Sequence, residues 1–270
     1  MSLDSLNILT KSGNKVAMLT CYDATFAKLM ELEGLDVILV GDSLGMVIQG
    51  ADNTLNVSMH HMTYHTKCVS AGAPNTLIVA DMPLGSYEHD DEAAYKNALW
   101  LIKSGAHMVK FEGGGDRVRT ARYLVERGVP VCGHLGFTPQ SVNQLGGYKI
   151  QGKTPESAQQ ILNDAKAMDE AGVSMIVLEM VPAILAKKIT ESINAPTIGI
   201  GAGVECSGQV LVLQDLLGIY TGTANKKPED FKSPRFVRNF LKDTNSVQGA
   251  VSAYIKAVKN KTFPAQEHSY

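Results

Sequence analysis

The sequence predicts an α/β chain folded as a (β/α)8 TIM barrel, and three observations support this fold class. Short apolar runs rich in valine, isoleucine and leucine alternate with amphipathic helical segments along the 270 residues. Such runs are typical of strands buried on both faces in a parallel sheet. Eight strand-like units in about 250 residues fit a closed barrel better than an open doubly wound sheet. We predict one domain over 1–270, because no Pro/Ser-rich linker or low-complexity stretch divides the chain.

The predicted elements follow in a regular order. In the first half, four strands are each followed by a helix: strands 16–20, 36–41, 76–81 and 107–112, and helices 23–33, 58–72, 90–105 and 117–128. The second half continues with strands 130–134, 174–179 and 196–203, a long loop 135–154, and helices 155–171 and 182–193. The eighth unit, 209–219, fits either strand or helix, because periodicity does not separate short apolar runs. Two helices, 233–242 and 246–260, are predicted to end the domain.

Two of the helices carry clear local signals. Segment 90–105 begins with acidic residues, which the helix dipole favours, and has an apolar stripe formed by Ala94, Ala98, Leu101 and Ile102. Segment 155–171 begins at Thr154-Pro155, a capping residue followed by proline at the first helical position. Its apolar side chains are expected to face the barrel: Ala158, Ile161, Leu162, Ala165 and Met168.

Acidic residues stand at the carboxyl ends of four predicted strands: Asp42, Asp81, Glu112 and Glu179. In a barrel these strand ends meet at one face, which carries the active site. Burying an unpaired carboxylate costs several kcal/mol, so such acids should face a cleft or bind a cation. We therefore predict that they converge on a site. The alternative is that one or two of them form structural ion pairs with Lys110 or an arginine.

Three of these acids predict a magnesium site. Asp42, Asp81 and Glu112 offer hard oxygen ligands, and no imidazole or thiolate stands beside them in the sequence, which favours Mg²⁺ over zinc or copper. Lys110 lies two residues before Glu112, so both side chains should point into the barrel. We expect Lys110 to bind a substrate carboxylate. A Schiff-base role is the weaker alternative, because nearby acids would keep its pKa high.

Other polar positions carry weaker signals. His134 ends the fifth strand, and Tyr22 follows the first, so either is expected to contact substrate or cofactor, or to be a satisfied buried side chain. His61 and His65 have metal-pair spacing but no third ligand nearby. The glycine loops at 41–43 and 199–203 suit anion binding, but no GxGxxG or Walker lysine supports a dinucleotide fold or a P-loop.

Composition excludes several classes of function. The net charge is -2, and no basic stripe is interleaved with aromatic residues, so nucleic acid is not an expected partner. The start has no apolar signal region, and no run approaches the ~18 apolar residues of a membrane helix, so we expect a soluble cytoplasmic protein with no membrane partner. The scattered cysteines are predicted to be reduced structural thiols: Cys21, Cys68, Cys132 and Cys206.

Nearly the whole chain resembles one family, ketopantoate hydroxymethyltransferase (3-methyl-2-oxobutanoate hydroxymethyltransferase) of pantothenate (vitamin B5) and coenzyme A biosynthesis. The most specific segment is GHLGFTPQSVNQLGGYKIQGK at 133–153. GDSLGM at 41–46 is less specific, because phosphoenolpyruvate mutases and isocitrate lyases carry similar strand ends. The other matching segments are TCYDATFAKL at 20–29, ADMPLGSY at 80–87, VKFEGG at 109–114, VLEMVP at 177–182 and IGIGAG at 198–203.

The resemblance implies a barrel of the phosphoenolpyruvate/pyruvate-type superfamily that transfers a hydroxymethyl group from 5,10-methylenetetrahydrofolate to 3-methyl-2-oxobutanoate, giving 2-dehydropantoate through a Mg²⁺-stabilised enolate. By position, Asp42 and Asp81 resemble direct Mg²⁺ ligands that also contact the substrate, and Glu112 resembles a third acid acting through water. Ser43 and Lys110 resemble contacts to the oxo acid. Glu179 resembles the catalytic base. Family members assemble as homo-oligomers, often decamers.

The sequence departs from the family at one position and leaves two rival functions. Ser207 stands where the family usually has aspartate, and this change could alter affinity for the folate. One rival is a Mg²⁺-dependent lyase or mutase of the phosphoenolpyruvate mutase and isocitrate lyase type, although no KxxCG-type loop follows the fourth strand. The other is a non-catalytic barrel that binds an oxo acid. Replacing Glu179 with glutamine should separate an enzyme from such a sensor.

Overall fold

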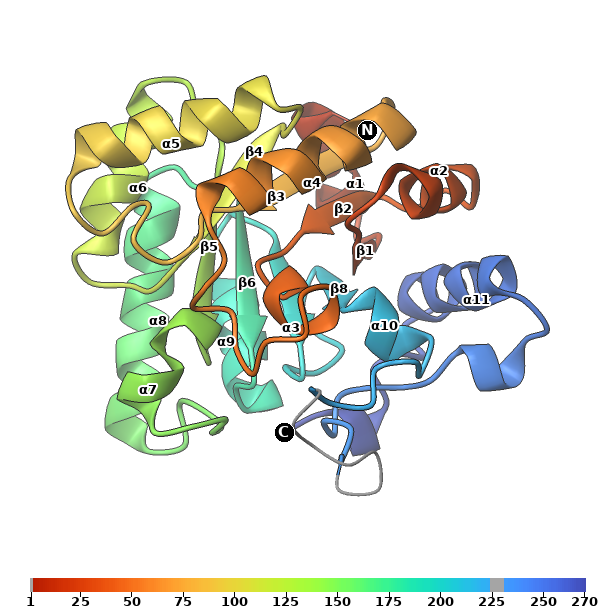
Figure 1. The fold of residues 1–270 in the computed structure, drawn as a ribbon. Coiled ribbons are helices and arrows are strands. Elements are labelled where there is room, and N and C mark those ends of the chain that lie inside the picture. Colours follow the sequence, from red (N-terminus) through yellow and green to blue (C-terminus); the bar gives the residue numbers. More distant parts are fainter. Residues whose placement is uncertain (1, 224–230) are drawn as a thin grey trace.

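The structure is a computed structural model that describes residues 2–223 and 231–270. In these residues, eight parallel strands form a closed barrel in which each strand pairs with the next and β8 pairs with β1 (Figure 1). The predicted (β/α)8 barrel is therefore confirmed. The strands are β1 Val16–Thr20, β2 Val37–Val40, β3 Leu77–Asp81, β4 Met108–Glu112, β5 Val131–Gly136, β6 Met175–Glu179, β7 Thr197–Ile200 and β8 Gly208–Leu211.

Helices surround this barrel (Figure 1). The longer ones are α1 Leu3–Lys11, α2 Ala24–Leu32, α4 Met59–Gly72, α5 Asp91–Lys103, α6 Arg117–Glu126, α8 Pro155–Glu170, α9 Ala183–Ser192 and α11 Val247–Lys259. Short helices follow the carboxyl ends of three strands: α3 Leu44–Val47 after β2, α7 Val142–Leu145 after β5, and α10 Leu213–Leu216 after β8. The 3-10 turns are η1 Pro139–Ser141, η3 Leu241–Asp243 and η4 Gln266–His268.

Local sequence explains where the helices begin and which face they bury. The Asp90 side chain accepts a hydrogen bond from the backbone N–H of Ala93 at the start of α5, and Thr154 caps α8 just before Pro155. The predicted apolar faces pack inward: Ala94, Ala98, Leu101, Leu162, Ala165 and Met168 are buried, and Ile102, Ala158 and Ile161 are partly buried against the core. These two helix predictions are confirmed.

The predicted helix at 233–242 is wrong. The structure has turns there, and η3 begins only at Leu241. The Asn239 side chain accepts hydrogen bonds from the backbone N–H groups of Leu241 and Lys242, and the Arg235 side chain donates to the backbone oxygen of Glu267. These side-chain to backbone bonds compete with the helical pattern. The other predicted C-terminal helix is present as α11.

Two further segments differ from the expected pattern. The ambiguous unit 209–219 contains both alternatives, because β8 ends at Leu211 and α10 begins at Leu213. The loop 135–154 is not wholly irregular, since it holds η1 and α7. Helix α1 and the short helix α3 were not expected from the sequence. Helix α1 precedes β1. Helix α3 begins directly after Ser43, which stands at its N-cap position just after β2.

Close packing closes the barrel and its helical layer. A Cβ atom added to Gly72 would lie 2.2 Å from the backbone oxygen of Ala24, so glycine permits the close approach of α4 to the start of α2. The buried Tyr254 hydroxyl of α11 lies 2.9 Å from the backbone oxygens of both Met18 and Gln209, which share its one proton. Tyr254 thus connects α11 to β1 and β8, the seam that closes the sheet.

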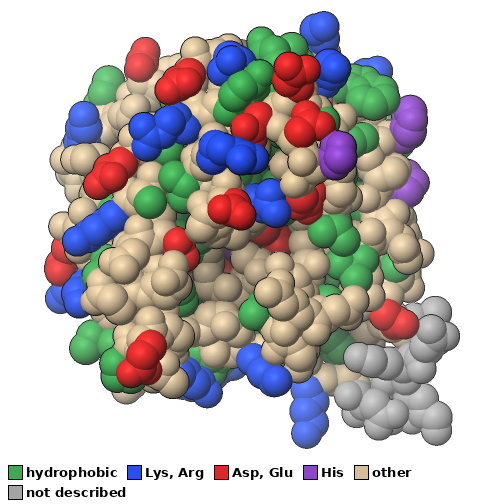
Figure 2. All heavy atoms as spheres, turned by 90° about the vertical axis from the view of Figure 1, so that its left-hand side faces the viewer, with side chains coloured by type: hydrophobic (Ala, Val, Ile, Leu, Met, Phe, Trp, Pro, Cys, Tyr) green, Lys and Arg blue, Asp and Glu red, His purple; other side chains and the backbone are tan. Residues whose placement is uncertain are grey.

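The composition-based expectations have different outcomes. The four cysteines are free, and burial raises the pKa of the Cys21 and Cys132 thiols to about 12, which suits unreactive structural thiols. Across the described ranges, the helices are too short or too polar to cross a membrane. On the face shown in Figure 2, acidic and basic side chains are interspersed. The expected lack of nucleic-acid binding stays a prediction.

Candidate active site

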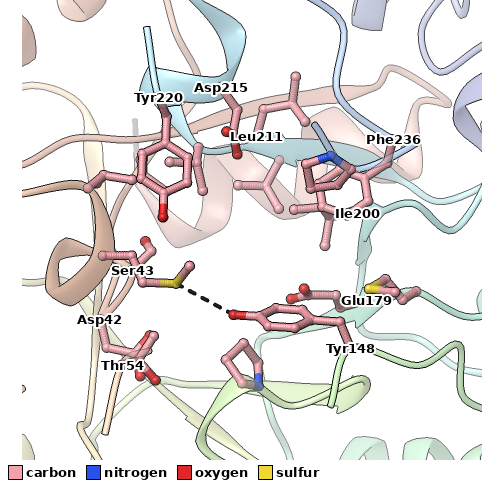
Figure 3. Close-up of a pocket in the computed structure, with 18 of the residues that line it drawn as sticks. Asp42, Ser43, Thr54, Tyr148, Glu179, Ile200, Leu211, Asp215, Tyr220 and Phe236 are labelled. Atoms are coloured by element: carbon pink, nitrogen blue, oxygen red, sulfur yellow. Dashed lines mark hydrogen bonds between the residues drawn. The ribbon is translucent and has the colours of Figure 1, made fainter. Parts of the chain in front are cut away.

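The main candidate site is a cavity of about 520 Å³ at the carboxyl end of the barrel. It is lined by nearly all the site residues expected from the sequence: Asp42, Ser43, Asp81, Lys110, Glu112, His134 and Glu179. The parallel topology sends each of their strands toward this same end. Figure 3 shows Asp42 and Glu179 at one end of the cavity, with Tyr148 beside Glu179. The residues that sequence patterns single out are therefore brought together.

Asp81 lies at the centre of a buried ion-pair network. Lys110 Nζ lies 2.9 Å from Asp81 Oδ1 as an ion pair, although the angles of this contact do not meet hydrogen-bond criteria. The backbone N–H of Asp42 donates to Asp81 Oδ2 at 2.9 Å. The sequence left open that one or two of the acids form an ion pair with Lys110, and the structure shows this for Asp81. This ion pair does not neutralise the site, because Asp42 and Glu112 are also buried in the same cavity wall.

Gln140, in the turn η1 after β5, holds the other two acids in place. Its Nε2 atom donates to Asp42 Oδ2 at 2.8 Å, and its backbone N–H donates to Glu112 Oε2 at 2.9 Å. Its Oε1 atom accepts a hydrogen bond of 2.7 Å from the Tyr87 hydroxyl. That bond fixes which end of the amide faces Asp42. Gln140 Nε2 also donates to the backbone oxygen of Met82, just after β3, so this residue contacts the ends of three strands without itself being at a strand end.

Charge in this cluster is out of balance. Burial raises the pKa of Asp42, and the neighbouring carboxylates of Asp81 and Glu112 raise it further. Burial also raises the pKa of Glu112, to about 8. For Lys110, burial alone would lower the pKa, but the surrounding carboxylates outweigh it and the pKa is raised. Lys110 stays an ammonium ion, which disfavours the Schiff-base role. One cation faces three acids, so the site favours a further positive charge.

The donor set fits a magnesium ion. Among the described residues, Glu112 Oε1 is buried without a hydrogen bond, and so is Asp81 Oδ1, whose charged neighbour is the Lys110 ammonium. In residues 2–223 and 231–270, no three side chains of the His, Cys, Asp and Glu types are already arranged as a metal-binding group. Mg²⁺ does not require such a group, because it usually binds one or two carboxylates and completes its shell with water and substrate oxygens. The buried, oxygen-only acids of this cluster match that preference.

His134 links the acid cluster to Glu179. Its Nδ1 atom lies 3.4 Å from Lys110 Nζ and 3.6 Å from Glu112 Oε1, and its Nε2 atom lies 3.2 Å from Glu179 Oε2. An ammonium group can only donate, so Nδ1 accepts and Nε2 carries the ring proton toward Glu179. Burial and the Lys110 charge lower the pKa of His134, which keeps the ring neutral. The Nε2 contact lacks the geometry of a hydrogen bond, so His134 lies beside Glu179 and lines the cavity without holding its carboxylate by such a bond.

Glu179 is the one of the four acids set apart from the Asp42, Asp81 and Glu112 cluster. It ends β6, and its side chain keeps 14% exposure, whereas the side chains of Asp81 and Glu112 are more deeply buried. Burial raises the pKa of Glu179, and the neighbouring His134 moderates the shift. A carboxylate with a raised pKa that faces a cavity is a suitable proton acceptor.

The weaker candidates have supporting positions. The Tyr22 hydroxyl lies behind Ser43, 2.8 Å from its Oγ atom, and outside the residues that line the cavity. His65 bonds through Nδ1 to the backbone oxygen of Tyr22 at 2.7 Å. His61 accepts from the backbone N–H of Ser58 in the cap of α4. The spaced histidine pair therefore serves local structure.

Ser207 lies at the amino end of β8, away from the strand ends that form the cavity. Its Oγ atom accepts from the backbone N–H of Thr197 at 3.2 Å, and its own N–H donates to Thr197 Oγ1 at 3.2 Å. It does not line the cavity. The structure therefore gives no contact through which this departure from the family would reach a substrate.

Sequence reasoning missed three residues of the site as individual candidates: Tyr87, Gln140 and Asp215. Gln140 is contained in the specific segment 133–153, but no residue pattern distinguishes it there. Asp215 follows β8, and the strand-end argument used for the other acids would have found it if the ambiguous unit 209–219 had been divided correctly.

Comparisons with known proteins agree with this site. A family model for ketopantoate hydroxymethyltransferase matches residues 1–266. A relative from Chromobacterium violaceum, named 3-methyl-2-oxobutanoate hydroxymethyltransferase, is 54% identical to this chain. The match covers 100% of this chain and 99% of the relative. The corresponding protein of Methylobacillus flagellatus is 53% identical and is covered over 100% of both chains, and that of Neisseria meningitidis is 52% identical, covering 100% of this chain and 99% of the relative.

Solved structures support the fold. Phosphoenolpyruvate phosphomutase from Streptomyces platensis subsp. rosaceus superposes with a TM-score of 0.60 at 12% identity, covering 80% of this chain and 82% of that chain. A 2,3-dimethylmalate lyase of the PEP mutase/isocitrate lyase superfamily gives 0.58 at 15% identity, covering 77% and 80%. At identities this low, the superpositions show that the barrel fold is shared, and they say nothing about the activity of this chain. The full-length matches are decisive for the family, and the chain belongs to the ketopantoate hydroxymethyltransferase family of enzymes.

Proposed function

We propose that the protein transfers a hydroxymethyl group from 5,10-methylenetetrahydrofolate to 3-methyl-2-oxobutanoate and so forms 2-dehydropantoate for pantothenate and coenzyme A biosynthesis. The observation that carries the proposal is one cavity that holds both a buried cluster of acids and a lysine and, apart from it, a partly buried glutamate that can act as a base. The names of the full-length relatives support the reaction class.

The oxo acid should bind against Lys110 and Ser43. The Lys110 ammonium is buried beside Asp81, and an ammonium group in this position attracts the substrate carboxylate. The Ser43 hydroxyl, held by Tyr22, offers a second polar contact. Mg²⁺ held by Asp42 and Asp81, with Glu112 as the third acid, would stabilise negative charge that develops on the keto oxygen.

Glu179 is placed to remove the C3 proton of the oxo acid. Its raised pKa makes its carboxylate a stronger base than an exposed glutamate, and the neutral His134 ring lies 3.2 Å from it. The deprotonated carbon then forms a bond to the one-carbon unit, whose two bonds to N5 and N10 of the folate break as each nitrogen takes up a proton, one from C3 and one from water. Water supplies the oxygen of the new hydroxyl group, because neither the methylene unit nor the oxo acid provides that oxygen atom.

Proton NMR of 3-methyl-2-oxobutanoate in D₂O tests this proposal. We expect Mg²⁺-dependent loss of the C3 proton signal without the folate, and 2-dehydropantoate after the folate is added. Glu179→Gln should lose exchange by at least about 100-fold, within the range of general base catalysis. Glu170→Gln is a matched control, because Glu170 ends α8, whereas Glu179 lines the cavity. No exchange and no product with the unchanged protein would overturn the assignment.

We also propose that the protein works in the cytoplasm as a homo-oligomer, which the family resemblance suggests is a decamer. Large apolar side chains remain on the surface of the single chain, among them Ile184 with 82% and Leu32 with 71% exposure. Exposed apolar surface of this kind can serve subunit contacts. Size-exclusion chromatography with light scattering tests the proposal, and a species of 29.0 kDa, the mass of one chain, would contradict it.

A further inference from the structure

The cavity has a second end that the oxo-acid cluster does not use. Asp215, in α10 after β8, lines this end together with Tyr220, Ile200 and Phe236. Figure 3 shows the Asp215 carboxylate pointing into the cavity from the wall opposite Asp42 and Glu179. Asp215 therefore faces Asp42 and Glu179 across the same cavity.

The Asp215 side chain makes no hydrogen bond or ion pair with the part of the chain that the structure describes. Asp52, another acid of the same cavity, differs, because it accepts a hydrogen bond of 2.6 Å from Thr223 Oγ1. Asp215 is partly buried and faces the cavity, so a ligand bound there can supply the hydrogen-bond donors that the described residues do not. Burial raises the pKa of Asp215 to about 6, so at neutral pH it remains an ionised group that can only accept hydrogen bonds.

The surroundings of Asp215 suit a flat ring. Ile200, Leu211 and Phe236 give apolar walls, and Tyr220 packs edge-on against Phe231 with ring centroids 5.2 Å apart. On the other side of the cavity, Tyr148 packs on Phe137 at 4.9 Å. A ligand that satisfies Asp215 must therefore carry hydrogen-bond donors on one edge and an aromatic or apolar body.

We propose that Asp215 binds the pterin ring of the reduced folate by accepting hydrogen bonds from its N3–H and 2-amino groups. This inference rests on the proposed function and assigns one end of the cavity to each substrate. Ionised 3-methyl-2-oxobutanoate has acceptors but no N–H or O–H donor, so it cannot satisfy a carboxylate. The pterin presents two adjacent, parallel donors that match two carboxylate oxygens.

Binding in this way would orient the one-carbon unit. The donor edge of the pterin lies at the end of the bicyclic ring away from C6 and from the N5–N10 bridge that carries the methylene group. With the donor edge on Asp215, the carbon to be transferred is directed across the cavity toward Glu179 and the oxo acid. Fixing the geometry of two reacting molecules lowers the barrier to their reaction.

The first test is Asp215→Asn, which keeps the shape but replaces one acceptor with a donor. We expect tetrahydrofolate to bind about 10- to 100-fold more weakly in calorimetry, and the KM for 5,10-methylenetetrahydrofolate to rise equally, as for loss of hydrogen bonds to a charged group. The C3 exchange of the oxo acid should persist, because the folate takes no part in it. Asp52→Asn, in the same cavity but bonded to Thr223, is the matched control and should change folate binding less than about 3-fold.

The second test changes the ligand. A tetrahydrofolate analogue with a 2-methyl group in place of the 2-amino group should bind the unchanged protein at least about 10-fold more weakly than tetrahydrofolate, but should lose little further in Asp215→Asn. Equal binding of the two ligands to the unchanged protein overturns the inference, and so does normal tetrahydrofolate affinity of the variant. Either result with normal turnover leaves the proposed function intact. Failure of C3 exchange and of product formation in the unchanged protein would instead remove the proposed function.

Discussion

Gln140 shows how one neutral side chain organises several charges. Its amide donates to Asp42 while its backbone N–H donates to Glu112, and the Tyr87 hydroxyl fixes the amide orientation. Because Asp42 and Glu112 both have raised pKa values, any loss of these donors favours their protonated forms. A protonated acid is a poorer ligand for a cation. Gln140 is therefore expected to act through the acids and not on the substrate itself.

The substitution Gln140→Glu tests this role. It places a carboxylate where Asp42 Oδ2 now accepts a hydrogen bond, so we expect the Mg²⁺ concentration needed for half-maximal C3 exchange to rise about 10- to 100-fold. High Mg²⁺ should recover part of the rate. Gln159→Glu, on the exposed face of α8, is the control and should leave the Mg²⁺ dependence unchanged. An equal loss of rate at all Mg²⁺ concentrations would contradict the positioning role.

Asp215 is expected to lower the stability of the folded protein at neutral pH. Its pKa is about 6 when folded and 3.8 as its ordinary value, so the folded state holds the proton more tightly. Ionisation above pH 6 therefore destabilises the fold, and the penalty is relieved as the pH falls through 6 toward 4. Asp215→Asn should be more stable than the unchanged protein by up to about 3 kcal/mol at pH 7.5. Denaturant midpoints at pH 7.5 and 4.5 check this, and a gap that does not narrow at the lower pH would contradict it.

At the scale of elements, the closing seam of the barrel depends on α11. Tyr254→Phe removes the hydroxyl that donates to the backbone oxygens of Met18 in β1 and Gln209 in β8. We expect a loss of about 1–3 kcal/mol in the free energy of unfolding, because buried acceptors lose a partner. KM values should not change, since Tyr254 does not line the cavity. Tyr64→Phe, at a side chain with 65% exposure, should change stability by less than about 0.5 kcal/mol.

Elements also show where sequence patterns succeed and fail. Strands β1, β2 and β3 could be predicted because each is a largely apolar run that parallel packing buries on both faces. The segment 233–242 could not, because its path is set by Asn239 and Arg235 bonding to backbone groups, including one from Glu267 far along the chain. Such contacts leave no periodic signal. The eighth unit was ambiguous because a four-residue strand is followed at once by a short helix.

At the scale of the whole molecule, the convergence of the acids follows from topology alone. Once eight parallel strands close into a barrel, residues that end different strands must meet at one face, and this made Asp42, Asp81, Glu112 and Glu179 predictable as a group. Gln140 was not predictable, because its position depends on the path of the loop that turns back over the cavity after β5. Asp215 differs again, since only the three-dimensional structure shows that its side chain has no partner among the described residues.

The acid cluster also predicts how the whole molecule responds to metal. Three buried acids share one lysine, so a divalent cation that binds only the folded form should stabilise it, by about 2.7 kcal/mol at 100 times its Kd. That corresponds to a rise in Tm of roughly 5–10 °C for a chain of this size. Adding 3-methyl-2-oxobutanoate should raise Tm further only when Mg²⁺ is present, because its keto and carboxylate oxygens complete the metal shell.

Thermal denaturation with EDTA, with Mg²⁺, and with Mg²⁺ plus the oxo acid measures this coupling. EDTA should abolish C3 exchange without unfolding the protein, because the barrel core is apolar and complete without the ion. In Asp81→Asn the Mg²⁺ shift should largely disappear, since one charged oxygen donor is lost and Lys110 then offsets more of the remaining negative charge. If the oxo acid stabilises the protein as strongly in EDTA as in Mg²⁺, then Lys110 and Ser43 alone bind it, and the acids serve the fold and not a metal.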